Sequence, residues 1–367
     1  MCIRVLSGLR CSAVGFRQPA HGFTFYAPVK RTMTKNNERG FVVPMSETTS
    51  VGDIVEYAEK AEELGYTEIS MGETTGWNVV PVLASVAEAT DELRITQHVL
   101  SPYSRSPALI AQTAVTLADI SDGRYRLGVG ASSPELAERW HSREFDRPLG
   151  HVKETVEIVK EVQTGERVEY DGDAFTVDGM KLTCPAPDEP VEIDVAALGP
   201  KTTEMAGKLA DGWNPQLLPK QGLRERMKAF EDGLMESGRS QDDVTVAPVV
   251  RCCVASESEG ARQQARMMLA FMIARYGPFY RNAIAEFGWE DAVEDIQEGW
   301  DEGGVGEAAK EVPDGLVDDV AAVGTPDEAR SKLEEFESIE GVDYVRVAFA
   351  GMLGDEQKDS TMRELAP

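Results

Sequence analysis

Short apolar runs alternate with helical patterns along the chain from residue 40 onward. The runs have the length of buried strands and lie at residues 41–44, 67–71, 93–100, 125–129, 191–197, 212–214, 244–254 and 344–349. Between them, apolar residues recur every three or four positions, which predicts helices at residues 51–64, 79–89, 108–120, 152–162, 200–209, 223–235 and 326–336. The pattern therefore predicts eight strands, most of them separated by a helix.

Strands that alternate with helices form parallel sheets with right-handed crossovers, and eight of them favour closure into a barrel. The predicted fold class is therefore α/β, a (β/α)8 TIM barrel over residues 39–355, followed by a tail at residues 356–367. We expect two insertions. One is a β-hairpin with an Asp-Gly turn near residues 166–182, and the other is mostly helical, near residues 259–320, between strands 7 and 8.

The N-terminal segment differs in composition from the rest. Residues 1–39 contain seven Lys and Arg residues and one acidic residue, Glu38. A basic, acid-poor leader is typical of targeting peptides, but its apolar run is too broken for a secretory signal. We expect residues 1–38 to be disordered, or a mis-assigned extension with translation beginning at Met33.

The charge of the chain limits its partners. With 37 basic and 64 acidic residues the net charge is −27, which repels nucleic acid and anionic membranes and suggests a halophilic host. No apolar run approaches the roughly 20 residues of a membrane span. The five cysteines form no C-x-x-C pair, so we expect no disulfide framework and no metal site. These features favour a cytoplasmic protein that acts on a small molecule.

Chemistry in a barrel gathers where strands end, so the loops after the strands hold the candidate residues. After strand 2, Glu73 is a candidate acid or base, and Trp77 a candidate wall for a ring-shaped cofactor. The alternative is a helix-capping turn with a solvated carboxylate. After strand 4, the glycines of Gly128-x-Gly130 depart from a dinucleotide fingerprint but let a flat ligand approach the backbone.

Two further loops hold candidate ligand contacts. After strand 5, residues 198–202 open a helix at Pro200, where free N–H groups and Lys201 could hold a phosphate. The alternative is an ordinary helix N-terminus with proline in its first turn. Gln216, at the rim of strand 6, is a candidate substrate contact by position alone.

Several motifs together resemble one family. They are LSPYSRSP at residues 100–107, LADISDGR at 117–124, LGVG at 127–130, GPK at 199–201, AG at 206–207 and ADG at 210–212. Their order and spacing resemble the bacterial-luciferase-like superfamily. Within it they resemble the coenzyme F420-dependent branch, which includes methylenetetrahydromethanopterin reductase and F420-dependent glucose-6-phosphate dehydrogenase. The resemblance implies a luciferase-type barrel, coenzyme F420 as cofactor and a homodimer or homotetramer.

The resemblance also implies roles for individual residues. The family has a cis, non-prolyl peptide bond behind the deazaflavin ring, which corresponds to His98–Val99 here. Ser101 corresponds to a polar ring contact, and Leu198, Gly199, Lys201 and Thr202 to contacts with the phosphate tail. The remaining cofactor positions correspond to Gly72, Gly130, Ala131, Ser132 and Ser133.

This chain differs from its best-known relatives at their acidic positions. Gly72 and Glu73 stand where the sugar-phosphate dehydrogenase has an Asp-His pair, and Ser133 stands at its acidic rim position. Phe41 stands where the reductase has a catalytic acid in strand 1.

The resemblance and these differences together leave three hypotheses about function. The first is hydride transfer between reduced F420 and an organic substrate, such as a methylenetetrahydropterin or folate, with Glu73 as proton donor or acceptor. The second is an FMN-dependent monooxygenase on the same fold. The third is a non-catalytic flavin-binding barrel.

Overall fold

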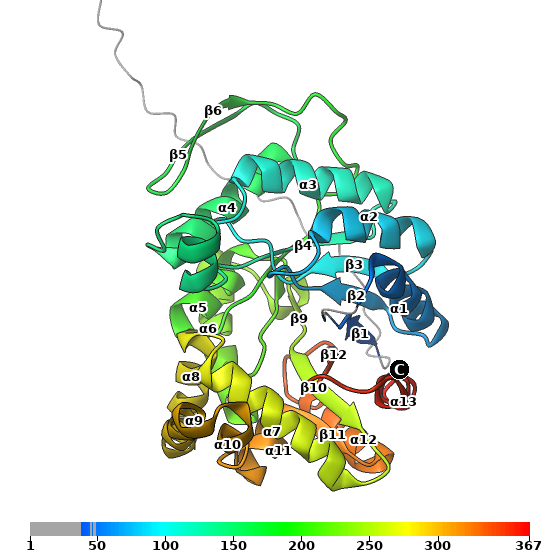
Figure 1. The fold of residues 1–367 in the computed structure, drawn as a ribbon. Coiled ribbons are helices and arrows are strands. Elements are labelled where there is room, and N and C mark those ends of the chain that lie inside the picture. The colour runs from blue at the N-terminus through cyan, green and yellow to red at the C-terminus, as the bar shows by residue number, and fades with distance from the viewer. Residues whose placement is uncertain (1–37, 45, 47–48) are drawn as a thin grey trace, which may run out of the picture. The chain divides into compact units, whose positions relative to one another are not determined.

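Eight parallel strands close into a barrel in the computed structural model, which describes residues 38–44, 46 and 49–367 (Figure 1). The strands are β1 (Arg39–Val42), β2 (Glu68–Met71), β3 (Arg94–Gln97), β4 (Tyr125–Val129), β7 (Ile193–Val195), β8 (Gly212–Trp213), the pair β9 (Thr245–Val246) and β10 (Val249–Val254), and β12 (Val345–Phe349). β9 pairs with β8 and β10 pairs with β12, so the stretch 245–254 closes the ring. The predicted (β/α)8 fold is confirmed. The extension predicted over residues 1–38 lies outside the described residues, apart from Glu38.

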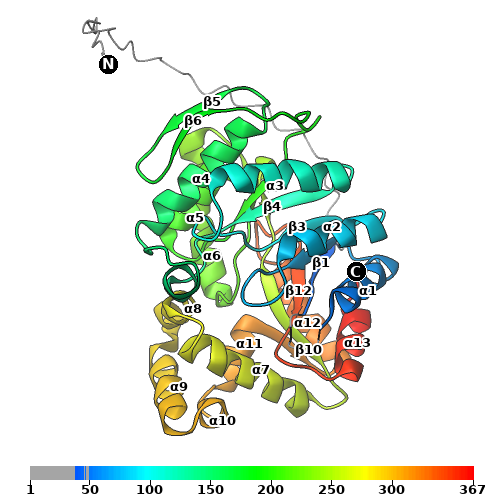
Figure 2. The same cartoon turned by 45° about the horizontal axis from the view of Figure 1, so that its top comes forward.

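Helices cover the outside of the barrel, as Figure 2 shows. They are α1 (Val51–Glu63), α2 (Val79–Ala89), α3 (Pro107–Ile120), α4 (Pro148–Val162), α5 (Pro200–Leu209), α6 (Lys220–Ser237) and α12 (Pro326–Glu337). Local sequence explains their starts: Ser50 and Asp53 form a capping box on α1, and Ser106 caps α3 in front of Pro107. No helix in the described part of the chain is both long and apolar enough to cross a membrane.

Two insertions extend the barrel. β5 (Val168–Asp171) and β6 (Thr176–Met180) form an antiparallel hairpin after α4. After β10, the helices α7 (Ser258–Ala274), α8 (Pro278–Ile284), α9 (Glu290–Gly303), α10 (Val305–Ala308) and α11 (Asp314–Val320) lie side by side (Figure 1). The insertion ends in β11 (Ala321–Gly324), which pairs with β10. Helix α13 (Asp355–Glu364) occupies most of the segment that we expected to be a tail, and it buries Met362.

Paired charges fill the interior of the barrel. Arg346 of β12 forms ion pairs with Glu68 of β2 and, at 3.1 Å, with Asp194 of β7; Asp194 also pairs with Arg126 of β4 at 2.5 Å. Burial would raise the pKa of Glu68, but the charge of Arg346 lowers that pKa to about 2. A side chain at Gly212 would meet the Asp194 carboxylate at 2.0 Å, so glycine leaves the room that this cluster needs.

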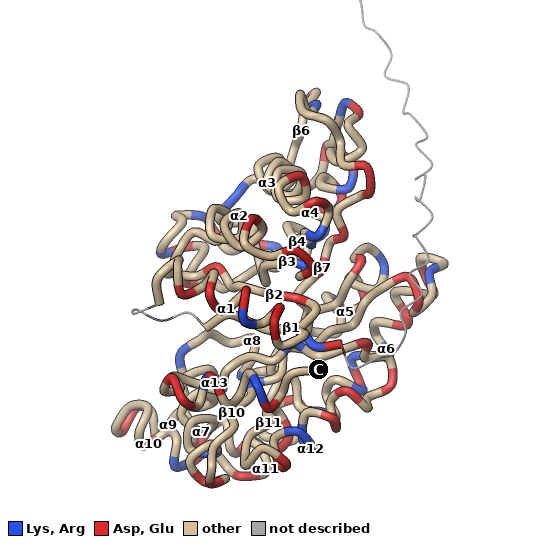
Figure 3. The backbone as a smooth tube through the Cα atoms, turned by 90° about the vertical axis from the view of Figure 1, so that its right-hand side faces the viewer, with Lys and Arg blue, Asp and Glu red and all other residues tan. Residues whose placement is uncertain are grey.

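Acidic residues also occur on the helices. Figure 3 marks them along both the helices and the strands, interspersed with fewer basic residues. Many exposed carboxylates take part in short-range pairs within one helix, such as Glu135 with Arg139 and Asp359 with Arg363. Exposed pairs of this kind contribute little to stability. The acidity of the chain is therefore a property of its surface, whereas the interior carboxylates Glu68 and Asp194 are paired with arginines.

Candidate active site

A hollow of about 410 Å³ opens beyond the carboxyl ends of β2 and β3. We call it the site hollow. It is lined by Glu73, Thr74, Gly76, Trp77, Asn78, Val99, Ser101, Ser104, Arg105, Leu109, Leu136 and His141. Its volume lies in the range of small-molecule sites. Four residues chosen from the sequence, Glu73, Trp77, Val99 and Ser101, are therefore brought together at the mouth of the barrel.

The carboxylate of Glu73 is held by an arginine. Nη2 of Arg105 donates to Oε1 of Glu73 at 2.8 Å, and Nη1 contacts Oε2. The same guanidinium donates to Oδ1 of Asn78 at 3.2 Å, and the backbone N–H of Val79 donates to Oε1 of Glu73 at 3.4 Å. Glu73 is therefore an oriented carboxyl group in the loop before α2, more constrained than a solvated carboxylate in a turn.

Trp77 and Val99 provide apolar surface to the site hollow. The Trp77 side chain is 48% exposed, although its Nε1 donates to the carbonyl of Thr49 at 2.8 Å. An exposed ring anchored at its polar end presents a flat face on which a planar ligand can lie. Val99 packs against Gly130, where a Cβ atom would come within 2.8 Å of the Val99 side chain.

The glycines after strand 4 serve packing between strands. A Cβ atom at Gly128 would meet the carbonyl oxygen of Gln97 at 2.0 Å, and the space beside Gly130 is filled by Val99. The sequence reasoning that these glycines let a ligand approach the backbone is therefore wrong for Gly128. At Gly130 the residue that takes the free space is Val99, which itself lines the site hollow.

The peptide bond between His98 and Val99 is cis, at the position that the family resemblance implied. The imidazole of His98 faces the barrel interior, where Nδ1 lies 2.9 Å from Oγ of Ser70 and Nε2 lies 3.2 Å from Oδ2 of Asp194. Burial lowers the pKa of His98, and the positive charge of Arg346 lowers it further. The His98 side chain therefore contacts the charged residues of the interior, whereas its neighbour Val99 reaches the site hollow.

Ser101 connects the loop after β3 to the loop after β4. Its Oγ donates to the carbonyl of Ala131 at 3.2 Å and accepts from the N–H of Tyr103 at 3.2 Å. In the second loop, Ser132 has a left-handed backbone with φ of 63°, and Oγ of Ser133 accepts from the N–H of Leu136 at 3.3 Å. These contacts fix the rim of the site hollow, and Ser133 lies two residues before the π-helical turn Glu135–Trp140.

The N-terminus of α5 has no side-chain cap among the described residues. Gly199 is its N-cap and carries no capping side chain, Pro200 follows, and the first turn contains no acidic residue. The Thr202 hydroxyl donates to the carbonyl of Gly199 at 2.9 Å, while Lys201 is exposed. Unpaired N–H groups beside a lysine match the requirements of a phosphate. Leu198, Gly199, Lys201 and Thr202 thus lie together, outside the lining of the site hollow.

Gln216 lies at the rim of strand 6, as its position in the sequence predicted. It is half-buried and forms an isolated bridge with Val249. It does not line the site hollow. Gly72 lies just before Glu73, and a Cβ atom there would sit 3.6 Å from the carbonyl oxygen of His98, an ordinary contact distance.

Eight of the twelve residues that line the site hollow received no role from the sequence, and two of these eight, Arg105 and His141, have ionisable side chains. Arg105 lies in the LSPYSRSP motif, but its partner Glu73 is 32 positions away, so only the fold shows the pair. His141, which directly follows the π-helical turn, had no local motif to mark it. The sequence could have marked Arg105 in one way: it is a basic residue in a loop that follows a strand of the predicted barrel.

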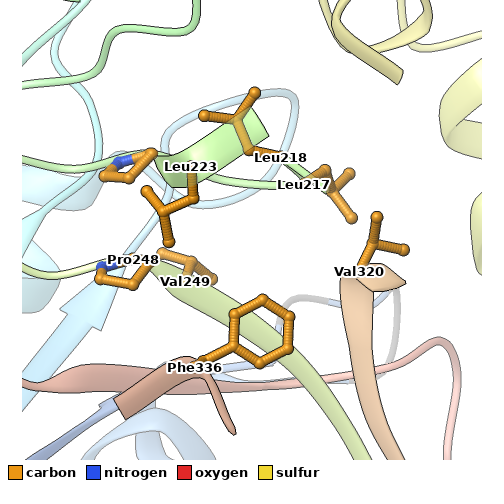
Figure 4. Close-up of a pocket in the computed structure, with 8 residues that line it drawn as sticks. Leu217, Leu218, Leu223, Pro248, Val249, Val320 and Phe336 are labelled. Atoms are coloured by element: carbon orange, nitrogen blue, oxygen red, sulfur yellow. The ribbon is translucent and has the colours of Figure 1, made fainter. Parts of the chain in front are cut away.

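A second cavity is apolar and very small. It has a volume of about 10 Å³ and lies between the segment after β8 and the start of β10 (Figure 4). It is lined by Pro215, Leu217, Leu218, Leu223, Pro248, Val249, Val320 and Phe336. A cavity of this size holds one water molecule at most, and an apolar one stays dry. It is therefore a packing gap.

Comparisons with known proteins agree with this geometry. A family model described as luciferase-like monooxygenase matches residues 31–342. A 5,10-methylenetetrahydromethanopterin reductase of Archaeoglobus fulgidus is 30% identical over 308 residues, which cover 83% of this chain and 91% of the relative.

Two solved structures are similar in fold. The coenzyme F420-dependent tetrahydromethanopterin reductase of Methanopyrus kandleri has a TM-score of 0.73 at 20% identity, covering 90% of this chain and 97% of its own. An F420-dependent secondary alcohol dehydrogenase, solved with an F420-acetone adduct, has a TM-score of 0.75 at 19% identity, covering 90% and 98%.

Proposed function

The chain belongs to the luciferase-like monooxygenase family, and we propose that it is a coenzyme F420-dependent oxidoreductase. Its relative from Archaeoglobus fulgidus is a reductase of 5,10-methylenetetrahydromethanopterin, and two similar structures carry F420 dependence in their names. The observation that carries the proposal is the site hollow, because it places a flat aromatic wall beside an oriented carboxylate at the mouth of the barrel.

A deazaflavin cofactor fits the residues present. Trp77 and Val99 offer apolar surface for its ring, and Ser101 with the loop of residues 130–133 offers polar contacts. The uncapped start of α5, with Lys201, suits the phosphate of its tail. When bound, such a cofactor supplies two electrons as a hydride.

The residues of this chain would orient the substrate and move a proton. Glu73 accepts a proton in one direction of the reaction and returns it in the other, and Arg105 keeps its carboxylate in one orientation. Trp77, Val99 and Leu136 limit the access of water to the reacting atoms. Gly72 and the loop of residues 130–133 complete the cofactor side, and Gln216 contacts the substrate from strand 6.

The substrate class of the proposal is a methylenetetrahydropterin or folate. Phe41, which stands where the reductase has a catalytic acid in strand 1, does not argue against this substrate class. Phe41 is fully buried and packs against Tyr57, Tyr66 and Phe349, outside the barrel interior. A substitution at this position therefore concerns packing between strand and helix. We propose further that the protein works in the cytoplasm of a halophilic host, as a homodimer or homotetramer.

A second candidate, an FMN-dependent monooxygenase, is favoured by the description of the matching family model. The two are separated by titrating the purified protein with oxidised F420 and, in parallel, with FMN, using the distinct absorbance spectra and the fluorescence of each. We expect saturable F420 binding at least tenfold tighter than FMN binding. Turnover of reduced F420 is then measured with methylenetetrahydrofolate and simple carbonyl compounds. Preferential binding of FMN would overturn the proposal.

A further inference from the structure

One arginine in the barrel has no anionic partner within the described residues. Nε of Arg251, on β10, is buried and donates no hydrogen bond to any described residue. The hydrogen bond of its guanidinium runs from Nη1 to the carbonyl of Phe349 at 3.4 Å, which is long. Burial lowers the pKa of Arg251, and the nearby phenols of Tyr280 and Tyr276 only partly oppose this.

Other arginines also have a buried nitrogen without a hydrogen bond, but unlike Arg251 they form ion pairs with described residues. Arg94, Arg126 and Arg262 also each have one such nitrogen. Each of these three nevertheless forms an ion pair, with Glu38 at 3.0 Å, Asp194 at 2.5 Å and Asp318 at 2.7 Å. Arg251 is partly buried and its Nε is enclosed, and an enclosed charged group without a counter-charge is costly. The absence of a described carboxylate at Arg251 therefore calls for an anion from elsewhere.

The strand register places Arg251 inside the barrel, near its mouth. Arg251 pairs with Ala348, and Val249 pairs with Arg346. Paired residues of parallel strands face the same side, and residues two apart share that side. Because Arg346 faces the interior charges, Arg251 faces the interior one layer closer to the carboxyl ends of the strands, where barrel enzymes bind substrates.

The helical insertion connects this arginine to the rim of the site. Tyr276 directly precedes Gly277 and Tyr280 follows it three residues later; their ring centroids are 5.7 Å apart, and both phenols act electrostatically on Arg251. Gly277 has a φ of 113°, and a Cβ atom placed on it would lie 4.0 Å from the Cβ of Ser133. The turn at Gly277 thus spans from the loop after β4 to the guanidinium on β10.

We propose that Arg251, with Tyr276 and Tyr280 beside it, binds a carboxylate group of the substrate at the barrel mouth. This inference rests on the proposed oxidoreductase function and adds the chemical class of the substrate. A free Nε and an Nη form the planar fork that matches two carboxylate oxygens. The half-buried ring of Tyr280 limits the water that would otherwise compete for the anion, whereas Tyr276 is 41% exposed and leaves the site open to a ligand.

The charge at the site favours a carboxylate over a phosphate. The groups that act on Arg251 are two phenols and a thiol, with no second cation among the described residues. One guanidinium balances the single charge of a carboxylate, whereas a phosphate dianion would stay half-compensated beside a guanidinium whose Nε is buried. Arg251 is therefore a specificity-determining residue, distinct from the uncapped N-terminus of α5.

The experiment uses sodium acetate as the probe and the full chain, at constant ionic strength set with sodium chloride. The melting temperature and the heat of binding are measured at rising acetate, with and without saturating F420, which blocks the α5 site. We expect saturable stabilisation of the wild type in both series. Arg251→Gln should weaken acetate binding about tenfold or more, Arg251→Lys should weaken it less, and Arg363→Gln on the exposed face of α13 should match the wild type.

The expected results also separate this inference from the proposed function. Arg251→Gln should bind F420 like the wild type and, without acetate, should melt at the same or a higher temperature, because it removes an uncompensated charge. A fall in its melting temperature would assign Arg251 a purely structural role. Acetate binding that is equal in Arg251→Gln, or phosphate binding tighter than acetate, would overturn the proposal. Wild-type protein that binds acetate but not F420 would instead refute the cofactor assignment.

Discussion

Glu73 and Arg105 face each other through both oxygens of the carboxylate and both terminal nitrogens of the guanidinium, with Nη2 at 2.8 Å from Oε1. The two side chains come from the loops after β2 and β3, and only 15% of the Glu73 side chain and 12% of the Arg105 side chain is exposed. A bidentate pair of this kind fixes the direction of the carboxylate. The proton-transfer role that we assign to Glu73 therefore depends on Arg105.

Replacing Glu73 with glutamine should abolish most turnover while leaving the cofactor bound. The amide keeps the size of the side chain but cannot take up a proton, and loss of a general base costs about 100-fold or more. We expect the F420 dissociation constant, measured by fluorescence, to stay within about twofold. Glu88→Gln, on the exposed face of α2, is the matched control. Unchanged turnover in Glu73→Gln would refute the role.

Arg105→Met should also reduce turnover, and its effect on turnover should not add to that of Glu73→Gln. If Arg105 acts by orienting Glu73, the double variant Glu73→Gln/Arg105→Met is about as slow as Glu73→Gln alone. Steady-state kinetics of the wild type, both single variants and the double variant complete the cycle. Additive losses would show that Arg105 contacts the substrate or cofactor independently of Glu73.

The alternation of apolar runs and helical patterns was sufficient to predict the barrel, and the order of its strands explains part of the site. Glu73 and Ser101 follow neighbouring parallel strands, so their loops must meet at one end of the barrel. The orientation of individual side chains was not predictable. His98 turns into the barrel interior, where it lies beside Asp194, and its neighbour Val99 lines the site hollow.

Long-range pairing explains the remaining differences. β11 has four residues, Ala321–Gly324, and it is a strand because β10 offers a free edge there, a fact absent from the local pattern. α13 has a largely polar sequence, yet Met362 is fully buried and its carbonyl accepts from the Tyr66 hydroxyl at 2.9 Å. Whether Arg251 has a carboxylate partner depends on which acidic side chains lie near it in space. The sequence has 64 acidic residues and does not show which of them do.

Lys201→Ala should weaken cofactor binding without changing the fold. Lys201 is exposed at the first turn of α5, where its charge adds to that of the helix N-terminus. We expect the F420 dissociation constant to rise about tenfold at low salt and less at high salt. Lys208→Ala, near the other end of the same helix, removes an equal charge that already pairs with Glu204 and Glu236. Equal effects of the two variants would show that the phosphate of the cofactor does not bind at the N-terminus of α5.

Gly128→Ala should destabilise the barrel strongly. A Cβ atom there would come within 2.0 Å of the Gln97 carbonyl oxygen, and backbone atoms cannot move aside as a flexible side chain can. We expect a loss of about 1–3 kcal/mol or more in the free energy of unfolding, measured by urea denaturation. Gly260→Ala in α7 is the control, since nothing lies within 4 Å of its Cβ position, and helix propensity predicts a small gain. A neutral Gly128→Ala would show that β3 and β4 can move apart.

The interior charges should make stability depend on pH in two separate steps. The pKa of His98 is lowered in the fold, so between its folded value and the ordinary 6.5 the unfolded chain binds a proton that the folded chain does not. The free energy of unfolding should therefore fall as the pH drops below about 6.5, by at most about 1.4 kcal/mol per pH unit for this group. Glu68 adds a second step, because its stabilising contribution is complete above its ordinary pKa of 4.5 and is lost as the pH falls toward about 2.

His98→Gln isolates the first of these steps. Glutamine does not titrate, so the difference in unfolding free energy between wild type and variant should shrink as the pH falls from 7 through the window below about 6.5. Urea denaturation at half-unit pH intervals measures this difference, and contributions from acidic residues that do not interact with His98 cancel in it. A difference that grows on acidification would mean that the folded protein holds His98 protonated. In that case the attraction of Asp194, 3.2 Å away, would outweigh burial and the repulsion of Arg346.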